Sequence, residues 1–395
     1  MNVKFSNRME KLKTSEIREI LKVTQNPEVI SFAGGLPAPE LFPVHEIKKI
    51  SSLVLDEMGP ESLQYDLTEG YVPLRKQISE RMNRVYKTEL SEKNILIVCG
   101  SQQGLDFSGK VFIDKGDVIL CESPTYLGAI NAFKAYEPEF IEVPTDDFGM
   151  IPEELEKILN QRHDVKMIYV IPDFQNPTGK TWSFERRKKF MEVIEKYKIP
   201  VIEDNPYGEL RFSGEILPSL KSLDNLGLVV HLGTFSKTFC PGLRVGWICA
   251  SEHILEKYIL IKQGADLHTS SFSQRIISKM LENYDFEERL SKLKELYKKR
   301  RDLMIFEMKK KFPKNLKYTN PDGGLFTWVE LPEGFDGRKF LEECLKNNVA
   351  IVPGGSFFPN GGHENTFRLN YSNMSEEKII EGINRLSKVL NEFEY

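Results

Sequence analysis

The chain has 395 residues, 40% of them hydrophobic and 28% charged, as is typical of a folded globular protein. Its net charge is −4, which excludes the basic excess expected of a nucleic-acid-binding domain. There is no 18-residue apolar run and no apolar signal segment after Met1, so we expect neither a membrane span nor export. The cysteines lack C-x-x-C spacing and the histidines lack metal-ligand spacing, which predicts no metal site and favours the reducing cytoplasm.

The chain divides into three predicted regions. Residues 1–45 form an arm, with a short polar helix and then an extended stretch rich in Gly and Pro. Residues 46–284 form a large domain, in which continuous apolar runs alternate with helical segments. Continuous runs indicate strands buried on both faces, hence a mostly parallel α/β sheet. Residues 285–395 form a smaller α+β domain.

The predicted elements of the large domain follow from these runs. We expect strands at 95–98, 118–120, 167–171, 200–202, 228–232 and 246–248, and helices at 153–161 and 184–197. In the smaller domain we expect a long charged helix at 286–311, strands near 325–331 and 367–371, and helices near 338–347 and 375–391.

Residues 234–246, which follow an apolar strand, carry the most informative chemistry. Thr234, Ser236 and Arg244 can hold a phosphate. Lys237 can form an imine with an aldehyde. Pyridoxal phosphate has both groups and is bound by enzymes as a lysine Schiff base. On this segment alone, a solvated strand end explains the same residues equally well.

Polar residues also follow two other apolar strands. A pyridine ring needs an anion beside its nitrogen to act as an electron sink, and Asp204 fits that need. Asn176 and Tyr207 can donate hydrogen bonds to the phenolate oxygen of the ring. Singly, each has an ordinary explanation, as a turn residue or a half-buried aromatic. Together with the lysine segment, they favour a cofactor site.

The chain resembles the class I and II aminotransferases of fold type I, which depend on pyridoxal phosphate. Within them it resembles the branch of 2-aminoadipate and kynurenine aminotransferases and the enzyme domain of MocR-type regulators. Besides the segments of Asn176, Asp204 and Lys237, the matching stretches are 30–37, 65–71, 100–104 and 367–369. The resemblance implies a large domain with a mostly parallel mixed sheet between helices, and a smaller α+β domain.

The resemblance also implies roles at the cofactor. Tyr126 would stack on the pyridine ring, and Tyr65 would reach the phosphate in the neighbouring subunit. Active sites would therefore be shared within a homodimer. The phosphate would be held by five residues, namely Ser101, Gln102, Thr234, Ser236 and Arg244. Taken from the residues alone, Ser101 is better explained as an ordinary helix cap with nothing bound.

On the substrate side, the resemblance implies that Arg368 and Asn176 bind the α-carboxylate and that Gly35 presents its backbone nearby. Lys237, with its pKa lowered by neighbouring cations, would take the proton from Cα. Asp204 would keep the ring nitrogen protonated. The expected reaction moves an amino group from an L-amino acid to a 2-oxo acid, with 2-oxoglutarate as the expected acceptor, by a ping-pong mechanism.

Two alternatives remain open at this point. A carbon–sulfur lyase or a decarboxylase can be built on the same fold, since a fold does not fix the reaction. Release of pyruvate and ammonia would identify such a lyase. The other alternative is the effector-binding domain of a transcription regulator. It is disfavoured because the matching stretches begin near residue 30, which leaves no room for a preceding DNA-binding domain.

Overall fold

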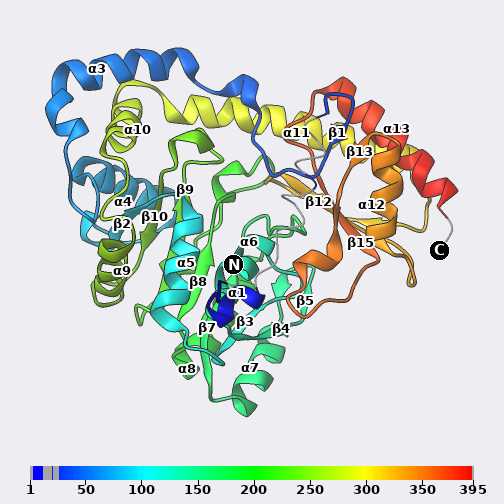
Figure 1. The fold of residues 1–395 in the computed structure, drawn as a ribbon, viewed down its shortest axis with the longest axis horizontal. Helices are drawn as coiled ribbons and strands as arrows, with labels where there is room; N and C mark the ends of the chain where they lie inside the picture. Colours follow the sequence, from blue (N-terminus) through cyan, green and yellow to red (C-terminus); the bar gives the residue numbers. More distant parts are fainter. Residues whose placement is uncertain (1–2, 12–19, 21–25, 394–395) are drawn as a thin grey trace.

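In the computed structural model, which describes residues 3–11, 20 and 26–393, a seven-stranded sheet forms the centre of the molecule (Figure 1). Its strand order is β2-β10-β9-β8-β7-β3-β4. β10 is antiparallel to both of its neighbours, and the other pairs are parallel. The strands are β2 (Ile95–Val98), β3 (Val118–Glu122), β4 (Glu139–Val143), β7 (Val165–Val170), β8 (Val201–Asp204), β9 (Val229–Thr234) and β10 (Gly246–Cys249).

Helices cover both faces of this sheet, because its strands are apolar on both sides. One face packs against α5, α6 and α9. The opposite face packs against α3, α4 and α10 near β2, and against α7 and α8 near β7. The helices are α3 (Val44–Leu63), α4 (Val72–Tyr86), α5 (Ser101–Phe112), α6 (Leu127–Lys134), α7 (Pro152–Gln161), α8 (Phe184–Tyr197), α9 (Glu252–Ala265) and α10 (Ser271–Asn283).

The C-terminal part of the chain forms a second, antiparallel sheet of order β11-β12-β15-β14. The long helix α11, yellow in Figure 1, runs from α10 towards this sheet and packs against α13. β1 of the predicted arm pairs with β13. These elements are α11 (Phe286–Lys311), α12 (Gly337–Lys346), α13 (Glu376–Glu392), β1 (Ile30–Ser31), β11 (Lys317–Tyr318), β12 (Phe326–Glu330), β13 (Val349–Ala350), β14 (Val352–Pro353) and β15 (Thr366–Asn370).

The predicted fold class and the predicted strands are confirmed, as are the helices at 153–161, 184–197 and 286–311. The strand β4 was missed, because Glu139 and Glu142 interrupt its apolar pattern. The short helix α1 (Asn7–Lys11) and a ribbon of β5 (Thr145–Asp146) and β6 (Gly149–Met150) complete the described α-helices and strands. Part of the predicted arm, residues 1–2, 12–19 and 21–25, lies outside the described residues. The three domain boundaries stay a prediction.

None of the helices in the described ranges combines the length and the apolar character that a bilayer crossing requires.

Candidate active site

The C-terminal ends of the parallel strands meet at one edge of the large sheet, where open α/β sheets bind ligands. Asp204 is the last residue of β8, and Thr234 is the last residue of β9. Ser101 begins the helix that follows β2. Tyr126 and Asn176 lie in the loops that follow β3 and β7. Residues far apart in the sequence are therefore brought to one edge by the direction of their strands.

A cavity of about 400 Å³ lies at this edge, within the size range of small-molecule sites. It reaches across to β15 of the second sheet. Every predicted site residue except Tyr65 lines it. The lining residues are Gly35, Ser101, Gln102, Tyr126, Ile171, Asn176, Asp204, Pro206, Tyr207, Thr234, Ser236, Lys237, Pro241, Arg244, Phe326 and Arg368.

The N-terminus of α5 forms one end of the cavity. Ser101 and Gln102 are its first two residues, so their backbone N–H groups have no acceptor within the helix. Gly100 precedes them with a φ of +71°, and a Cβ there would lie 2.5 Å from Nη2 of Arg244. Glycine at this position therefore lets the guanidinium lie against the helix end. Ser101 is the first helical residue rather than the cap, and no side-chain capping bond is formed.

Hydroxyl groups face the same end. Oγ1 of Thr234 donates to Oγ of Ser236 at 2.9 Å. Arg244, exposed to solvent, donates from Nη1 to that Oγ at 3.5 Å and from Nη2 to the carbonyl of Cys99 at 3.2 Å. One cation, two hydroxyls and the positive end of a helix thus converge, which is an arrangement suited to a phosphate.

Lys237 lies in the middle of the cavity lining. Its Nζ donates to the backbone carbonyl of Gly35 at 2.7 Å. Burial lowers the pKa of Lys237 to about 8, with the positive charges of Arg368 and Arg244 contributing in the same direction. The sequence-based expectation attributed this shift to neighbouring cations; desolvation is the larger cause. About a tenth of this lysine is therefore an uncharged amine at pH 7, far more than the ordinary lysine pKa of 10.5 would give.

Asp204 is 2% exposed and uses only one of its oxygens. Oδ2 accepts a hydrogen bond of 2.9 Å from the hydroxyl of Tyr169. Oδ1 is buried and has no hydrogen-bond partner among the described residues. Burial raises the pKa of Asp204 to about 6, while the Tyr169 hydrogen bond and the charge of His231 act in the opposite direction. An unpartnered carboxylate oxygen beside a cavity calls for a cationic donor, such as a protonated pyridine nitrogen.

Arg368 lies opposite, in the centre of β15, and is 2% exposed. Its Nη1 donates to Oδ1 of Asn176 at 2.7 Å, and its Nη2 donates to the carbonyl of Ala33 at 2.6 Å. The guanidinium carbon lies 4.1 Å from the ring centre of Phe326. Burial lowers the pKa of Arg368 to about 10. Both partners are neutral, so an anion is needed to balance this buried cation.

Two tyrosines complete the walls. Tyr207 is buried, accepts a hydrogen bond of 3.4 Å from Nδ2 of Asn176 and meets the ring of Phe326 edge-on. Tyr126 is half-buried, and burial raises its pKa. Both phenols therefore remain protonated near neutral pH and can donate hydrogen bonds.

Among its lining residues the cavity has three cations and one anion. Lys237, Arg244 and Arg368 provide the positive charges, and Asp204 provides the negative one. A site with this imbalance attracts anionic ligands, and its two arginines bond to different parts of the chain. The arrangement suits a molecule that carries a phosphate at one end and a carboxylate at the other.

The sequence analysis missed several residues of this region. Phe326, under the guanidinium of Arg368, and Tyr169, which holds Asp204, looked like ordinary core residues because they lie within strands. A hydroxyl in the otherwise aliphatic end of β7 was the available signal for Tyr169. Tyr65 lies outside the cavity, is 78% exposed and contacts the ring of His268 edge-on.

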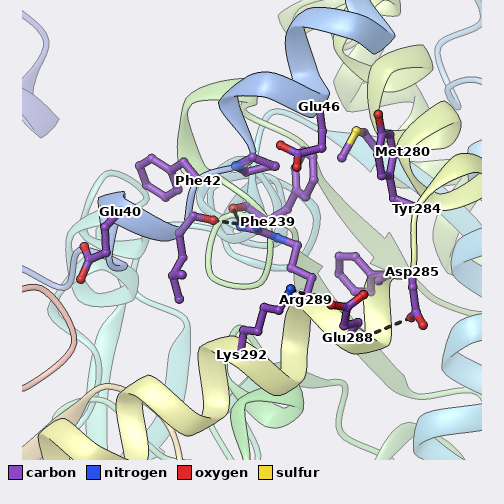
Figure 2. Close-up of a pocket in the computed structure, with 13 residues that line it drawn as sticks. Glu40, Phe42, Glu46, Phe239, Met280, Tyr284, Asp285, Glu288, Arg289 and Lys292 are labelled. Atoms are coloured by element: carbon purple, nitrogen blue, oxygen red, sulfur yellow. Dashed lines mark hydrogen bonds and ion pairs between the residues drawn. The ribbon is translucent and has the colours of Figure 1, made fainter.

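A second cavity, of about 290 Å³, lies between α3, the end of α10 and the start of α11 (Figure 2). None of the predicted site residues lines it. Arg289 donates from Nη1 to the carbonyl of Leu41 at 2.6 Å and from Nη2 to the carbonyl of Phe239 at 2.7 Å (Figure 2). Arg289 thereby links Phe239, which lies just after Lys237, to Leu41, which lies just before α3.

Comparison with known proteins gives consistent matches over the whole chain. The sequence model of the family described as aminotransferase class I and II matches residues 36–386. Aromatic-amino-acid aminotransferase 1 of Thermococcus litoralis is 45% identical over 392 residues, which cover 98% of this chain and 94% of that protein.

Two solved structures extend the similarity to the fold. The multiple substrate aminotransferase of Thermococcus profundus is 45% identical, with a TM-score of 0.94 over 98% of this chain and 97% of that one. The alpha-aminoadipate aminotransferase of Thermus thermophilus is 40% identical, with a TM-score of 0.92 over 98% and 97% of the two chains. The latter was solved with N-(5'-phosphopyridoxyl)-L-leucine, a covalent adduct of the cofactor and an amino acid.

Proposed function

The chain belongs to the class I and II aminotransferases, which depend on pyridoxal phosphate, and we propose that the cavity around Lys237 is its active site. One observation carries this proposal most directly. The amine of Lys237 lines a cavity that also contains a buried, unpartnered oxygen of Asp204 and a buried cation, Arg368, without an anionic partner in the described part of the chain.

The residues present fit the cofactor at both of its polar ends. Asp204 would pair its free Oδ1 with the protonated ring nitrogen. The phosphate would be held by Ser101, Gln102, Thr234, Ser236 and Arg244. When bound, pyridoxal phosphate supplies an aldehyde that an amine can attack and a ring that withdraws electrons. Tyr126 would cover the ring, and Asn176 and Tyr207 would donate hydrogen bonds to its phenolate oxygen.

Arg368 would bind the α-carboxylate of the substrate. Its planar guanidinium can pair with both carboxylate oxygens, and the buried setting strengthens that pair. The stack on Phe326 and the hydrogen bond to Asn176 fix its orientation before substrate arrives. Gly35, whose carbonyl faces Lys237, leaves room beside this pair because it has no side chain.

Lys237 would carry the proton. Its Nζ takes a proton from Cα of the amino acid and returns it later in the reaction. This role requires the uncharged amine. With a pKa of about 8, that form is far more populated near neutral pH than it would be with the ordinary lysine pKa of 10.5. Fixing the carboxylate on Arg368 holds the substrate so that the same atom can reach the Cα proton.

We propose an L-amino acid as donor and 2-oxoglutarate as acceptor. The names of two related proteins, which refer to aromatic amino acids and to 2-aminoadipate, support a donor with a sizeable side chain. The test is a panel of donors, each incubated without an acceptor. The aminotransferase releases one 2-oxo acid per active site and stops. A lyase would continue to release pyruvate and ammonia, and that outcome would refute the proposal.

We further propose that the enzyme acts in the cytoplasm as a homodimer with shared active sites. The exposed position of Tyr65, outside its own cavity, supports a role in the partner's site. Its test mixes two weakly active variants, Tyr65→Ala and Lys237→Ala, after partial unfolding. Random exchange should restore about a quarter of the wild-type activity, because half of the dimers then contain one intact site. Activity equal to the mean of the two variants would contradict sharing.

A further inference from the structure

Tyr169 lies beneath the candidate site and does not line the cavity. It is the fifth residue of β7, is 1% exposed and pairs in register with Ile202 of β8. Side chains alternate along a strand, so Asp204 points to the same face as Ile202, two residues earlier. The hydroxyl of Tyr169 can therefore reach diagonally across the strand pair to Oδ2 of Asp204, at 2.9 Å.

We propose that Tyr169 is a positioning residue, which holds Oδ2 of Asp204 so that Oδ1 faces the cofactor ring as an ionised carboxylate. This inference rests on the proposed site and adds a residue to it. Oδ2 accepts the hydrogen bond from Tyr169, and Oδ1 has no hydrogen-bond partner among the described residues, as this role requires. Phe133 packs edge-to-face on the ring of Tyr169, with centroids 5.6 Å apart, and so keeps the hydroxyl in place.

The electrostatic surroundings support the same role. The titratable groups that interact with Asp204 are Tyr169 on β7, Tyr126 before α6, Tyr207 after β8 and, through its charge from the opposite face of the sheet, His231 on β9. Burial raises the pKa of Asp204, and the Tyr169 hydrogen bond is the largest opposing contribution. Without that hydroxyl the pKa of Asp204 rises further above 6. The carboxyl then stays protonated to higher pH and cannot pair with a protonated ring nitrogen.

The direct test is Tyr169→Phe, which removes only the hydroxyl. Tyr258→Phe is the matched control, because Tyr258 is also fully buried in the core on the same face of the sheet and its hydroxyl bonds Ser108 at 2.8 Å instead. The dissociation constant of pyridoxal phosphate is measured by absorbance titration of each apoprotein from pH 5 to 8.5. In wild type, affinity should fall as the pH drops through about 6, where Asp204 takes up a proton.

In Tyr169→Phe, the midpoint of this acid limb should move up by about one pH unit, so that the dissociation constant rises about twofold at pH 7 and about tenfold at pH 5. The Tyr258→Phe profile should coincide with wild type. A Tyr169→Phe profile that coincides with wild type overturns the inference, as does an equal shift in Tyr258→Phe.

A second comparison tests the inference without relying on the pH profile. Asp204→Asn is compared with the double variant Tyr169→Phe/Asp204→Asn, which lacks both the tyrosine hydroxyl and the carboxylate charge of Asp204. If Tyr169 acts through Asp204, the two proteins should bind the cofactor equally well, within about twofold. A further loss of more than about fivefold in the double variant overturns the inference. Failure of the proposed function itself would appear differently, as unchanged cofactor affinity in Asp204→Asn.

Discussion

The two arginines of the cavity occupy opposite environments. Arg244 is exposed to solvent, follows a short turn of 3-10 helix with a φ of +55°, and bonds to Ser236 within its own loop. Arg368 is 2% exposed in the middle of a strand and bonds to Asn176 and Ala33, which are 192 and 335 residues away in the sequence. Both carry the same chemical group at the same cavity.

This difference separates two ways of building a binding site. The phosphate end combines a helix N-terminus with a loop that precedes β10, the two are joined by the hydrogen bond from Arg244 to Cys99, and Arg244 remains in contact with water. The carboxylate end exists only after three distant parts of the chain have packed together. A buried cation interacts more strongly with its ligand than an exposed one, because water screens it less. We therefore expect the carboxylate end to be less tolerant of change.

Of the changes that compare the two ends, Arg368→Lys should have the largest effect. An ammonium cannot form the bidentate pair, and it leaves the buried oxygens of Asn176 and Ala33 with fewer donors. The KM values for both the amino donor and the 2-oxo acid should rise about thirty- to a hundredfold, while the affinity for the cofactor stays within about twofold. Steady-state kinetics at saturating cofactor check this. Arg162→Lys, at an exposed cluster with Glu139 and Asp164, is the control and should match wild type.

A smaller effect, on cofactor binding rather than on substrate binding, is expected for Arg244→Lys. The lysine keeps the charge at an exposed position, so the dissociation constant of pyridoxal phosphate should rise only about three- to tenfold. The KM of the amino donor at saturating cofactor should not change. Titration of the apoprotein measures the first quantity and initial rates measure the second. A raised KM with unaltered cofactor affinity would reverse the assignment of the two arginines.

The smallest effect concerns salt. Raising the ionic strength from about 0.05 to about 0.5 M should weaken cofactor binding several-fold, because the Debye length shortens to a few ångströms and Arg244 is open to solvent. The KM of the amino donor should change by less than about twofold, since Arg368 is shielded from the solution. Sodium chloride titrations of both quantities check this. Equal salt sensitivity would mean that the two environments do not differ during catalysis.

Much of this site was predictable because local patterns encode it. The phosphate role of Ser101 was expected only from the family resemblance, whereas Asp204 and Thr234 end continuous apolar strands. The direction of the strands then brings such residues together without further information. The same reasoning predicted six of the seven strands of the large sheet, whereas β4, with its glutamates, was missed.

What could not be predicted depends on packing between distant segments. A tyrosine within β7 cannot be distinguished from a core residue until β8 is placed beside it. The stack of Arg368 on Phe326 requires the register of β12 against β15, and the contact of Lys237 with the carbonyl of Gly35 requires the arm to be in place. The origin of the lowered Lys237 pKa, which is mainly burial, likewise follows only from the folded structure.

The most direct measurement concerns Lys237. The holoenzyme is reduced with sodium borohydride and digested, and the mass of each lysine-containing peptide is determined. We expect the added mass of the reduced cofactor on the peptide with Lys237. The variant Lys237→Ala should carry none and should lose activity by at least about a thousandfold. Cofactor mass on a different lysine of the wild-type protein, or an active Lys237→Ala variant, would contradict this expectation.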